Sequence, residues 1–219
     1  MTYAALAAGF APFQVLASEL LPHAFAEDDG SHDVAHLLRV WNNAEAIRRK
    51  EGGDAETLAV AVLLHDCVAV EKNAPQRATA SRQAAVKATA LLSDLGWSAQ
   101  RTKAVAHAIE AHSFSAGVTP ETHLAKTLQD ADRLDAIGIV GVARCFYIAG
   151  RMGSGLYDPI DPRASSRQLD DKRFAMDHFR TKLFKLADGF QTATGRHMAA
   201  ERHQRLQRFY DLFFEEVGA

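Results

Sequence analysis

Apolar residues recur at helical spacing along almost the whole chain, and a convincing period-two alternation is absent. Start signals agree with this pattern: Asp54 with Thr57 marks one helix start, Ser98 marks another, and Pro120 opens a third. We therefore predict an all-α protein. The expected helices cover residues 11–22, 32–51, 54–70, 78–94, 98–112, 120–150, 171–193 and 196–217.

One stretch is apolar on every side and ends in two polar residues. Residues 58–64 are all apolar, and His65 and Asp66 follow them directly. A helix that is apolar all round is buried, and the unpaired charge of Asp66 would be costly there. Two adjacent helical residues lie about 100° apart, so both can border one cavity. The expected partner is either a core arginine or a metal ion shared with other ligands.

Composition narrows the class of protein. A chain of 219 residues with 47% hydrophobic and 24% charged residues is ordinary for one globular domain. A net charge of −2 and a pI near 6.5 give no basic footprint, so we expect no nucleic-acid polymer as a partner. No apolar run is long enough to span a bilayer, so we expect no membrane partner. Cys67 and Cys145 form no disulfide framework, which favours a cytoplasmic location.

Three short motifs follow one another in a characteristic order. They are His32-Asp33-x-x-His36-x-x-Arg39, then Leu63-Leu64-His65-Asp66, then the run of residues 129–138 with Asp130, Asp132 and Asp135. Together they resemble the HD-domain metal-dependent phosphohydrolases, and more closely a bacterial subgroup with nucleotide pyrophosphohydrolase members. The resemblance covers about residues 30–145. It implies a single HD-type helical bundle over residues 1–219, extended by C-terminal helices at about residues 171–217.

The resemblance also implies a role for individual residues. The implied ligands of one divalent metal ion are His36, His65, Asp66 and Asp132. Asp66 is also the implied catalytic residue, and Asp130 is the alternative to Asp132. His32 is expected beside the ligands as an orienting neighbour. Asp135 lies within about 60° of Asp132 around a helix, so we expect it as a second carboxylate behind the metal.

Basic residues near the motifs suit a substrate that carries several phosphates. Arg39 lies one turn after His36, and Lys72 follows the doublet helix, although each is also explained as a solvated or salt-bridging residue. His112, close to turn signals, is expected to contact a phosphate from the end of its helix. Some HD enzymes place an acidic residue one turn after the doublet. Here that position holds Ala69, so the general acid and base stay unassigned.

The leading hypothesis is hydrolysis of a nucleoside triphosphate to the monophosphate and pyrophosphate by a metal-activated water. The resemblance favours manganese, while the ligand types also fit Fe, Ni, Co, Zn or Mg. The alternatives are a phosphomonoesterase or phosphodiesterase of the same superfamily, a di-iron oxygenase using His107 or His112, or a non-catalytic module that binds a metal or nucleotide. A homodimer through the last helix is an alternative to packing of that helix on its own core.

The least regular segment covers residues 150–171, which are rich in glycine and proline and include Arg151, Arg163 and Arg167. A connection of this length is uncommon in a compact domain unless it is functional or disordered. Two interpretations follow. The segment is either a lid whose arginines reach phosphate, or a mobile surface loop.

Overall fold

The computed structural model describes residues 3–25, 33–68, 79–113 and 116–219. These residues contain α-helices, short 3-10 turns and no β-strand, so the all-α prediction is confirmed. No helix among them is both long enough and apolar enough to cross a lipid bilayer. The chain divides into an N-terminal unit, Met1–Asp132, and a C-terminal unit, Arg133–Ala219. Whether both belong to one HD-type domain stays a prediction.

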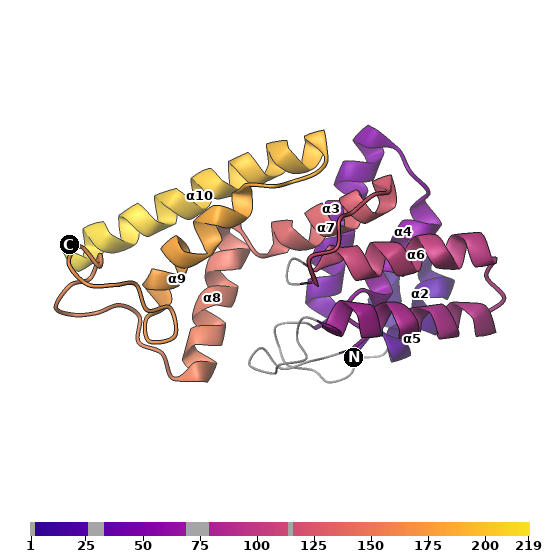
Figure 1. The fold of residues 1–219 in the computed structure, drawn as a ribbon, viewed down its shortest axis with the longest axis horizontal. Coiled ribbons are helices and arrows are strands. Elements are labelled where there is room, and N and C mark those ends of the chain that lie inside the picture. Colours follow the sequence, from indigo (N-terminus) through magenta and orange to yellow (C-terminus); the bar gives the residue numbers. More distant parts are fainter. Residues whose placement is uncertain (1–2, 26–32, 69–78, 114–115) are drawn as a thin grey trace. The chain divides into compact units, whose positions relative to one another are not determined.

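The N-terminal unit carries the motif residues. In it α3 packs on α4, α4 packs on α6, and α5 runs along α6 (Figure 1). The helix α7 ends in the first residues of the C-terminal unit. The helices are α1 (Tyr3–Ala7), α2 (Gln14–Leu20), α3 (Val34–Glu51), α4 (Ala55–Leu64), α5 (Ala80–Asp94), α6 (Ala99–His112) and α7 (His123–Asp135).

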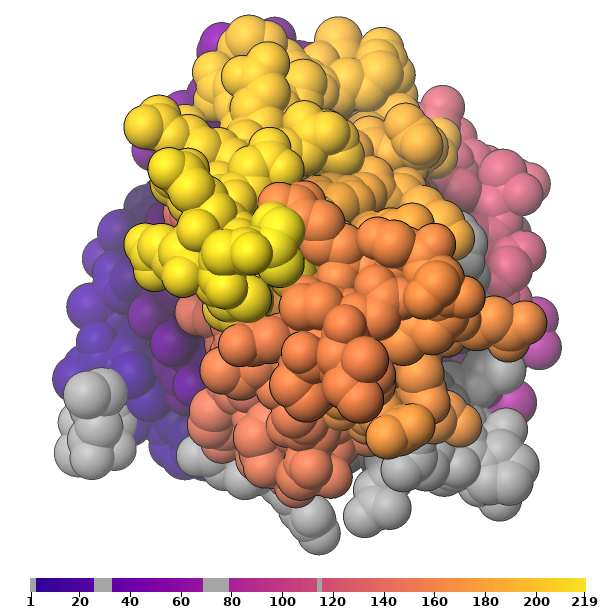
Figure 2. All heavy atoms as spheres, turned by 90° about the vertical axis from the view of Figure 1, so that its left-hand side faces the viewer, coloured from indigo at the N-terminus to yellow at the C-terminus, as the bar shows by residue number. Residues whose placement is uncertain are grey.

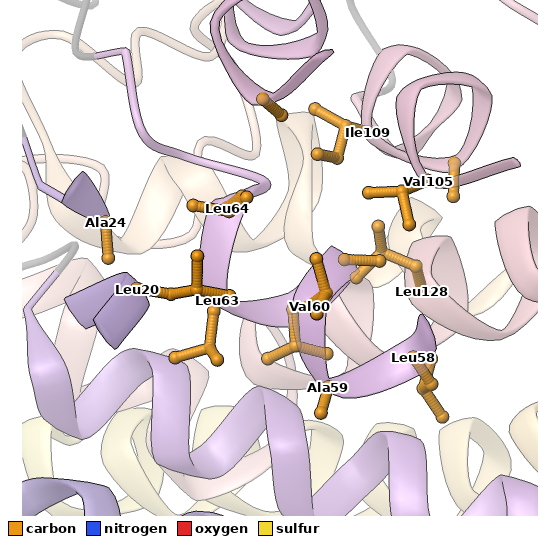
Figure 3. Close-up of a cluster of buried hydrophobic side chains, with 14 of the residues drawn as sticks. Leu20, Ala24, Leu58, Ala59, Val60, Leu63, Leu64, Val105, Ile109 and Leu128 are labelled. Carbon is orange, nitrogen blue, oxygen red and sulfur yellow. The ribbon is translucent and has the colours of Figure 1, made fainter. Parts of the chain in front are cut away.

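The apolar helix α4 forms the centre of this unit. Its side chains from Leu58 to Leu64 are all at most 2% exposed. In Figure 3 those of Leu58, Val60, Leu63 and Leu64 point to different sides of the helix. Asp54 caps its start, as predicted, because the Asp54 carboxylate accepts a hydrogen bond of 2.7 Å from the Thr57 amide. The end differs from the prediction. The helix stops at Leu64 instead of residue 70, where the apolar run gives way to His65 and Asp66.

Two other helix starts in this unit are also fixed by side-chain caps. The predicted cap Ser98 accepts a hydrogen bond of 3.4 Å from the Arg101 amide at the start of α6. At the start of α3, the Asp33 carboxylate accepts one of 2.8 Å from the amide of His36. Both caps satisfy amides that the helix itself leaves unpaired. The cap on α3 therefore fixes the first turn of the helix that carries His36.

The C-terminal unit has a core of aromatic rings. Its helices are α8 (Gly138–Met152), α9 (Ala175–Thr181) and α10 (Ala193–Val217). The predicted helix over 120–150 is two helices, because the chain breaks at Ile137 and Gly138 takes a left-handed φ of +72°. The predicted helix over 171–193 is the short α9 followed by a 3-10 turn. Packed rings are Phe146, Phe179, Phe184, Phe209, Tyr210, Phe213 and Phe214.

The segment between α8 and α9 is held in place by polar contacts inside the C-terminal unit. The Asp161 carboxylate accepts hydrogen bonds from the main-chain amides of Ser165, Ser166 and Arg167. Arg167 in turn donates to both carboxylate oxygens of Asp177, at 2.5 and 2.8 Å. These bonds argue against the alternative of a mobile surface loop, and they engage Arg167 in an ion pair. A role as a lid stays a prediction.

The same segment contacts the end of α10. Arg163 donates a hydrogen bond of 2.8 Å to the main-chain oxygen of Ala219, and the two stretches lie side by side on the face shown in Figure 2. The Arg163 guanidinium also lies 4.6 Å from the centre of the Phe214 ring. This arginine therefore helps to join the segment to the last helix of its own unit.

Candidate metal centre

Three helices of the N-terminal unit bring four of the predicted residues together. His36 lies in the first turn of α3, His65 and Asp66 directly follow α4, and Asp132 lies in the last turn of α7. We call these four residues the histidine–aspartate cluster. His65 and Asp66 lie in the turn after α4 instead of within a continuous helix. Their side chains nevertheless converge with His36, as the doublet pattern suggested.

The donor atoms of the cluster are close to one another. The Nε2 atoms of His36 and His65 are 3.3 Å apart. An Asp66 oxygen lies 3.8 and 3.5 Å from these two nitrogens, and an Asp132 oxygen lies 3.6 and 3.8 Å from them. Ligand bonds of about 2.0–2.2 Å place two ligands of one ion at most about 4.4 Å apart. All five distances are compatible with one shared ion.

The protonation of His65 also suits a metal ligand. Its Nδ1 lies 2.7 Å from the main-chain oxygen of Val62, which fixes the ring proton on Nδ1 and leaves a lone pair on Nε2. Burial lowers the pKa of His65, because the charged ring would lose its hydration, so the ring is neutral at neutral pH. A neutral imidazole nitrogen beside two carboxylates is a donor set that binds divalent cations.

The imidazoles and the carboxylates of the cluster differ in how much of each side chain is exposed to solvent. The side chains of His36 and His65 are 1% and 0% exposed, whereas those of Asp66 and Asp132 are 32% and 28% exposed. The imidazoles therefore lie on the inner side of the cluster, and the carboxylates line the side that solvent reaches. A substrate would approach from that side.

His112, predicted to contact phosphate, lies at the edge of the cluster. Its Nε2 is 3.5 Å from an Asp66 oxygen, and its ring packs edge-to-face on His65 with centres 4.9 Å apart. Burial by itself lowers the pKa of His112, but the hydrogen bond and charge of Asp66, with the charge of Asp132, raise it overall. His112 is thus a protonatable donor beside the cluster. His107, by contrast, accepts a hydrogen bond from the Glu121 amide.

Of the other residues predicted for the site, Asp130, Asp135 and Arg39 lie in the described part of the chain. Asp130, the alternative ligand, is fully buried. Asp135 is 1% exposed and accepts a hydrogen bond of 2.7 Å from Arg144 within the C-terminal unit. Arg39 is half-buried on α3. His32 and Lys72 lie outside the described residues, as does Ala69, so the roles given to them stay predictions.

One residue that supports the cluster was missed from the sequence. Asn43 is 5% exposed and donates a hydrogen bond of 3.0 Å to the main-chain oxygen of Ala131. This bond ties α3 to the turn of α7 that carries Asp132. Asn43 follows His36 by seven residues, so both lie on one face of α3. The seven-residue spacing between His36 and Asn43 was the one signal in the sequence that placed this side chain on the same face as the cluster.

Comparison with known proteins gives consistent matches. Residues 34–137 match the HD domain family. The uncharacterized protein YpgQ of Bacillus subtilis is 34% identical over 187 residues, which cover 84% of this chain and 83% of YpgQ. The crystal structure of YpgQ in complex with ADP has a TM-score of 0.68 at 31% identity, over 91% of this chain and 94% of that one. An HD-superfamily hydrolase from Bacillus thuringiensis has a TM-score of 0.68 at 27% identity over the full length of both chains.

These matches and the donor set point to the same kind of ligand. HD domains bind divalent metal ions, and the ligand atoms of His36, His65 and Asp66 lie within 4.8 Å of one another. Two imidazoles with carboxylates are compatible with Mn, Fe, Co, Ni or Zn. The cluster therefore fits a divalent metal, and its ligand types leave the identity of the metal open.

Proposed function

This chain belongs to the HD-domain family of metal-dependent phosphohydrolases, and on that premise we propose that it hydrolyses nucleoside triphosphates to monophosphates and pyrophosphate. The observation that carries the proposal is the pair of buried Nε2 atoms 3.3 Å apart, with two carboxylates within 3.8 Å of both. The ADP bound to the related YpgQ supports a nucleotide as the substrate.

Each residue of the cluster has a proposed role. His36, His65, Asp66 and Asp132 would hold one divalent ion, for which manganese is our first candidate. When bound, such an ion neutralises phosphate charge and lowers the pKa of a coordinated water. Asn43 would keep Asp132 in position through the main-chain oxygen of Ala131. Asp135 and His32 are proposed as supporting groups behind the ligands.

The phosphates would be held by cations around the open side of the cluster. Arg39 and Lys72 are proposed to bind phosphate oxygens, because a guanidinium or ammonium group forms strong charge-assisted hydrogen bonds with them. A protonated His112 would donate a further hydrogen bond to phosphate through Nε2, because its Nδ1 already lies 2.6 Å from the main-chain oxygen of Ile109. Water would then attack the α-phosphorus and release a proton to solvent, while the bond from that phosphorus to the oxygen bridging to the β-phosphorus breaks and pyrophosphate leaves.

A substrate panel tests this function. The protein is loaded with Mn²⁺ and assayed with ribonucleoside and deoxyribonucleoside triphosphates, diphosphates, a phosphomonoester and a phosphodiester. We expect equimolar monophosphate and pyrophosphate from triphosphates. Asp66→Ala should lower the rate at least about a hundredfold while circular dichroism stays helical. Asp94→Ala, on the exposed face of α5, is the matched control and should keep the wild-type rate.

The products also separate this function from the alternatives. Orthophosphate from monoesters without pyrophosphate would indicate a phosphomonoesterase, and cleavage of the diester alone would indicate a phosphodiesterase. Nucleotide binding without turnover would indicate a regulatory module. Equal rates for the wild type and Asp66→Ala would contradict the catalytic role of the cluster.

A further inference from the structure

A separate cavity of about 270 Å³ lies in the N-terminal unit, at the ends of the helices that carry the histidine–aspartate cluster. The end of α3, the first turns of α4 and α7, and the middle of α6 surround it. Side chains and main chain that line the cavity come from Gly53, Leu58, Ala104, His123, Leu124 and Thr127.

The helix geometry places this cavity away from the cluster. Arg48, which lines the cavity, follows His36 by twelve residues on α3, a rise of about 18 Å. Thr57 precedes His65 by eight residues, a rise of about 12 Å. Leu58 and Leu64 lie at opposite ends of α4, with core side chains between them (Figure 3). A ligand in the cavity would therefore bind at a site of its own.

The walls of the cavity are mostly apolar. Leu58, Leu124 and Ala104 supply aliphatic surface from three helices. The imidazole of His123 is fixed by a 3.1 Å contact from its Nε2 to the main-chain oxygen of Gly52. A fixed aromatic ring beside aliphatic side chains favours a flat ligand, because rings stack on it without ordering a flexible chain.

One buried polar atom in the wall of the cavity has no hydrogen-bond partner among the residues that the structure describes. Thr127 is 2% exposed, and its Oγ1 forms no hydrogen bond with the described residues. A buried hydroxyl without a partner costs free energy, and such groups in native proteins call for a specific explanation. A ligand that forms a hydrogen bond with the Thr127 hydroxyl would explain why this group is buried without a protein partner.

The charged groups at the rim are already paired. Arg48 donates to both carboxylate oxygens of Glu45, at 2.5 and 3.1 Å. Asp54 accepts the Thr57 amide at 2.7 Å and lies 3.6 Å from Arg101. These pairs leave little net charge facing the cavity. An ionic ligand would therefore lose its hydration without gaining an ion pair that offsets this cost.

We propose that this cavity binds an uncharged, planar small molecule of one or two rings that hydrogen bonds with Thr127 Oγ1. The size follows from the volume, which lies just below the range of about 300–1,000 Å³ for drug-sized ligands. The ligand is expected to be uncharged because the charged side chains at the rim are already paired. It is expected to be planar because the fixed imidazole of His123 favours stacking of a ring. Nothing in the hydrolytic reaction requires this second ligand.

Titrations of the full-length, ¹⁵N-labelled protein with adenine, benzimidazole and indole test the proposal. We expect saturable amide shifts around Ala104, Leu124 and Thr127 for at least one probe. The dissociation constant, measured by isothermal titration calorimetry, should be the same with Mn²⁺, with EDTA and in Asp66→Ala, because the cavity is separate from the cluster. Dependence on Mn²⁺ or on Asp66 would place the probe at the cluster and overturn the proposal.

Three variants sharpen the test. Ala104→Phe fills the cavity and should abolish binding, whereas Ala99→Phe, the same change at an exposed position of α6, should bind like the wild type. Thr127→Val keeps the side-chain shape and should weaken binding about five- to tenfold through the lost hydrogen bond. No saturable binding of any probe, or unchanged binding in both Ala104→Phe and Thr127→Val, would overturn the proposal.

Discussion

Two groups of aspartates in this protein are stabilised in different ways. In the C-terminal unit, Asp177 binds both terminal nitrogens of Arg167, and Asp161 accepts three main-chain amides. In the histidine–aspartate cluster, Asp66 and Asp132 instead lie 3.5–3.8 Å from imidazole nitrogens. The first group is neutralised by fixed protein donors. The second group faces imidazole nitrogens, a type of donor that can bind a metal ion.

The electrostatics of the two groups differ accordingly. The main-chain amides of Ser165 and Ser166 hold the pKa of Asp161 far below its usual range. In the cluster, burial lowers the pKa of His65, so this imidazole is not the cation that balances its aspartates. The difference distinguishes carboxylates that stabilise a loop from carboxylates that are suited to an added cation.

The largest expected effect is the loss of Mn²⁺ affinity when Asp132 is changed. Asp132→Asn keeps the size of the side chain but removes its charge, and we expect affinity for Mn²⁺ to fall about a hundredfold or more. Metal titration followed by electron paramagnetic resonance measures this affinity, with Asp94→Asn as the control for loss of an exposed charge. Wild-type affinity in Asp132→Asn would favour Asp130 as the ligand.

A large effect of another kind is expected in the C-terminal unit. Asp177→Ala removes the carboxylate that binds both terminal nitrogens of Arg167, whose Nε still lies 3.4 Å from a carboxylate oxygen of Asp158, in a site where the Asp177 side chain is 3% exposed. We expect a loss of about 3 kcal/mol in the free energy of unfolding, measured with urea, and no change in Mn²⁺ affinity. Asp188→Ala, an exposed change in the same unit, should cost little. A weakened metal site in Asp177→Ala would remove the distinction between the two groups.

A smaller effect is expected from Arg39, which we propose binds phosphate without contacting the metal. Arg39→Ala should raise KM for the triphosphate about tenfold and leave Mn²⁺ affinity unchanged, because one charge-assisted hydrogen bond is lost. Arg49→Ala on the same helix, where the arginine side chain is 75% exposed, is the matched control. Equal KM values for the two variants would argue against the role of Arg39.

The smallest effect is expected in the loop that Asp161 holds. Ala164 has a φ of +48°, a left-handed conformation that glycine adopts without cost. Ala164→Gly should therefore raise the free energy of unfolding by up to about 1 kcal/mol and leave turnover unchanged. Ala200→Gly on the exposed face of α10 should have the opposite sign. If Ala164→Gly also lowered the free energy of unfolding, the left-handed φ of Ala164 would not be a source of strain, which would contradict the prediction.

The sequence predicted best what is decided locally. Asp54 and Ser98 begin helices at the expected positions, because a side-chain cap acts within three residues. The apolar run up to Leu64 predicted a buried helix for the same reason. The doublet that follows it identified a polar site inside the core.

The sequence did not predict features that depend on distant residues. The break before Gly138 occurs where the side chain of Arg202 packs, so close that a Cβ at Gly138 would lie 3.1 Å from it. Asn43 reaches Ala131 across 88 residues of sequence, and its seven-residue spacing from His36 does not identify that partner. One of the two interpretations of the segment had Arg167 reach phosphate, because its partner Asp177 lies ten residues further along the chain, in α9.

The most direct test of the metal centre is a crystal structure with Mn²⁺, with its position taken from anomalous scattering. We predict one peak per chain, bonded at about 2.0–2.2 Å to Nε2 of His36 and His65 and to carboxylate oxygens of Asp66 and Asp132. A peak bonded to other residues, or no peak among these four at saturating Mn²⁺, would contradict the account.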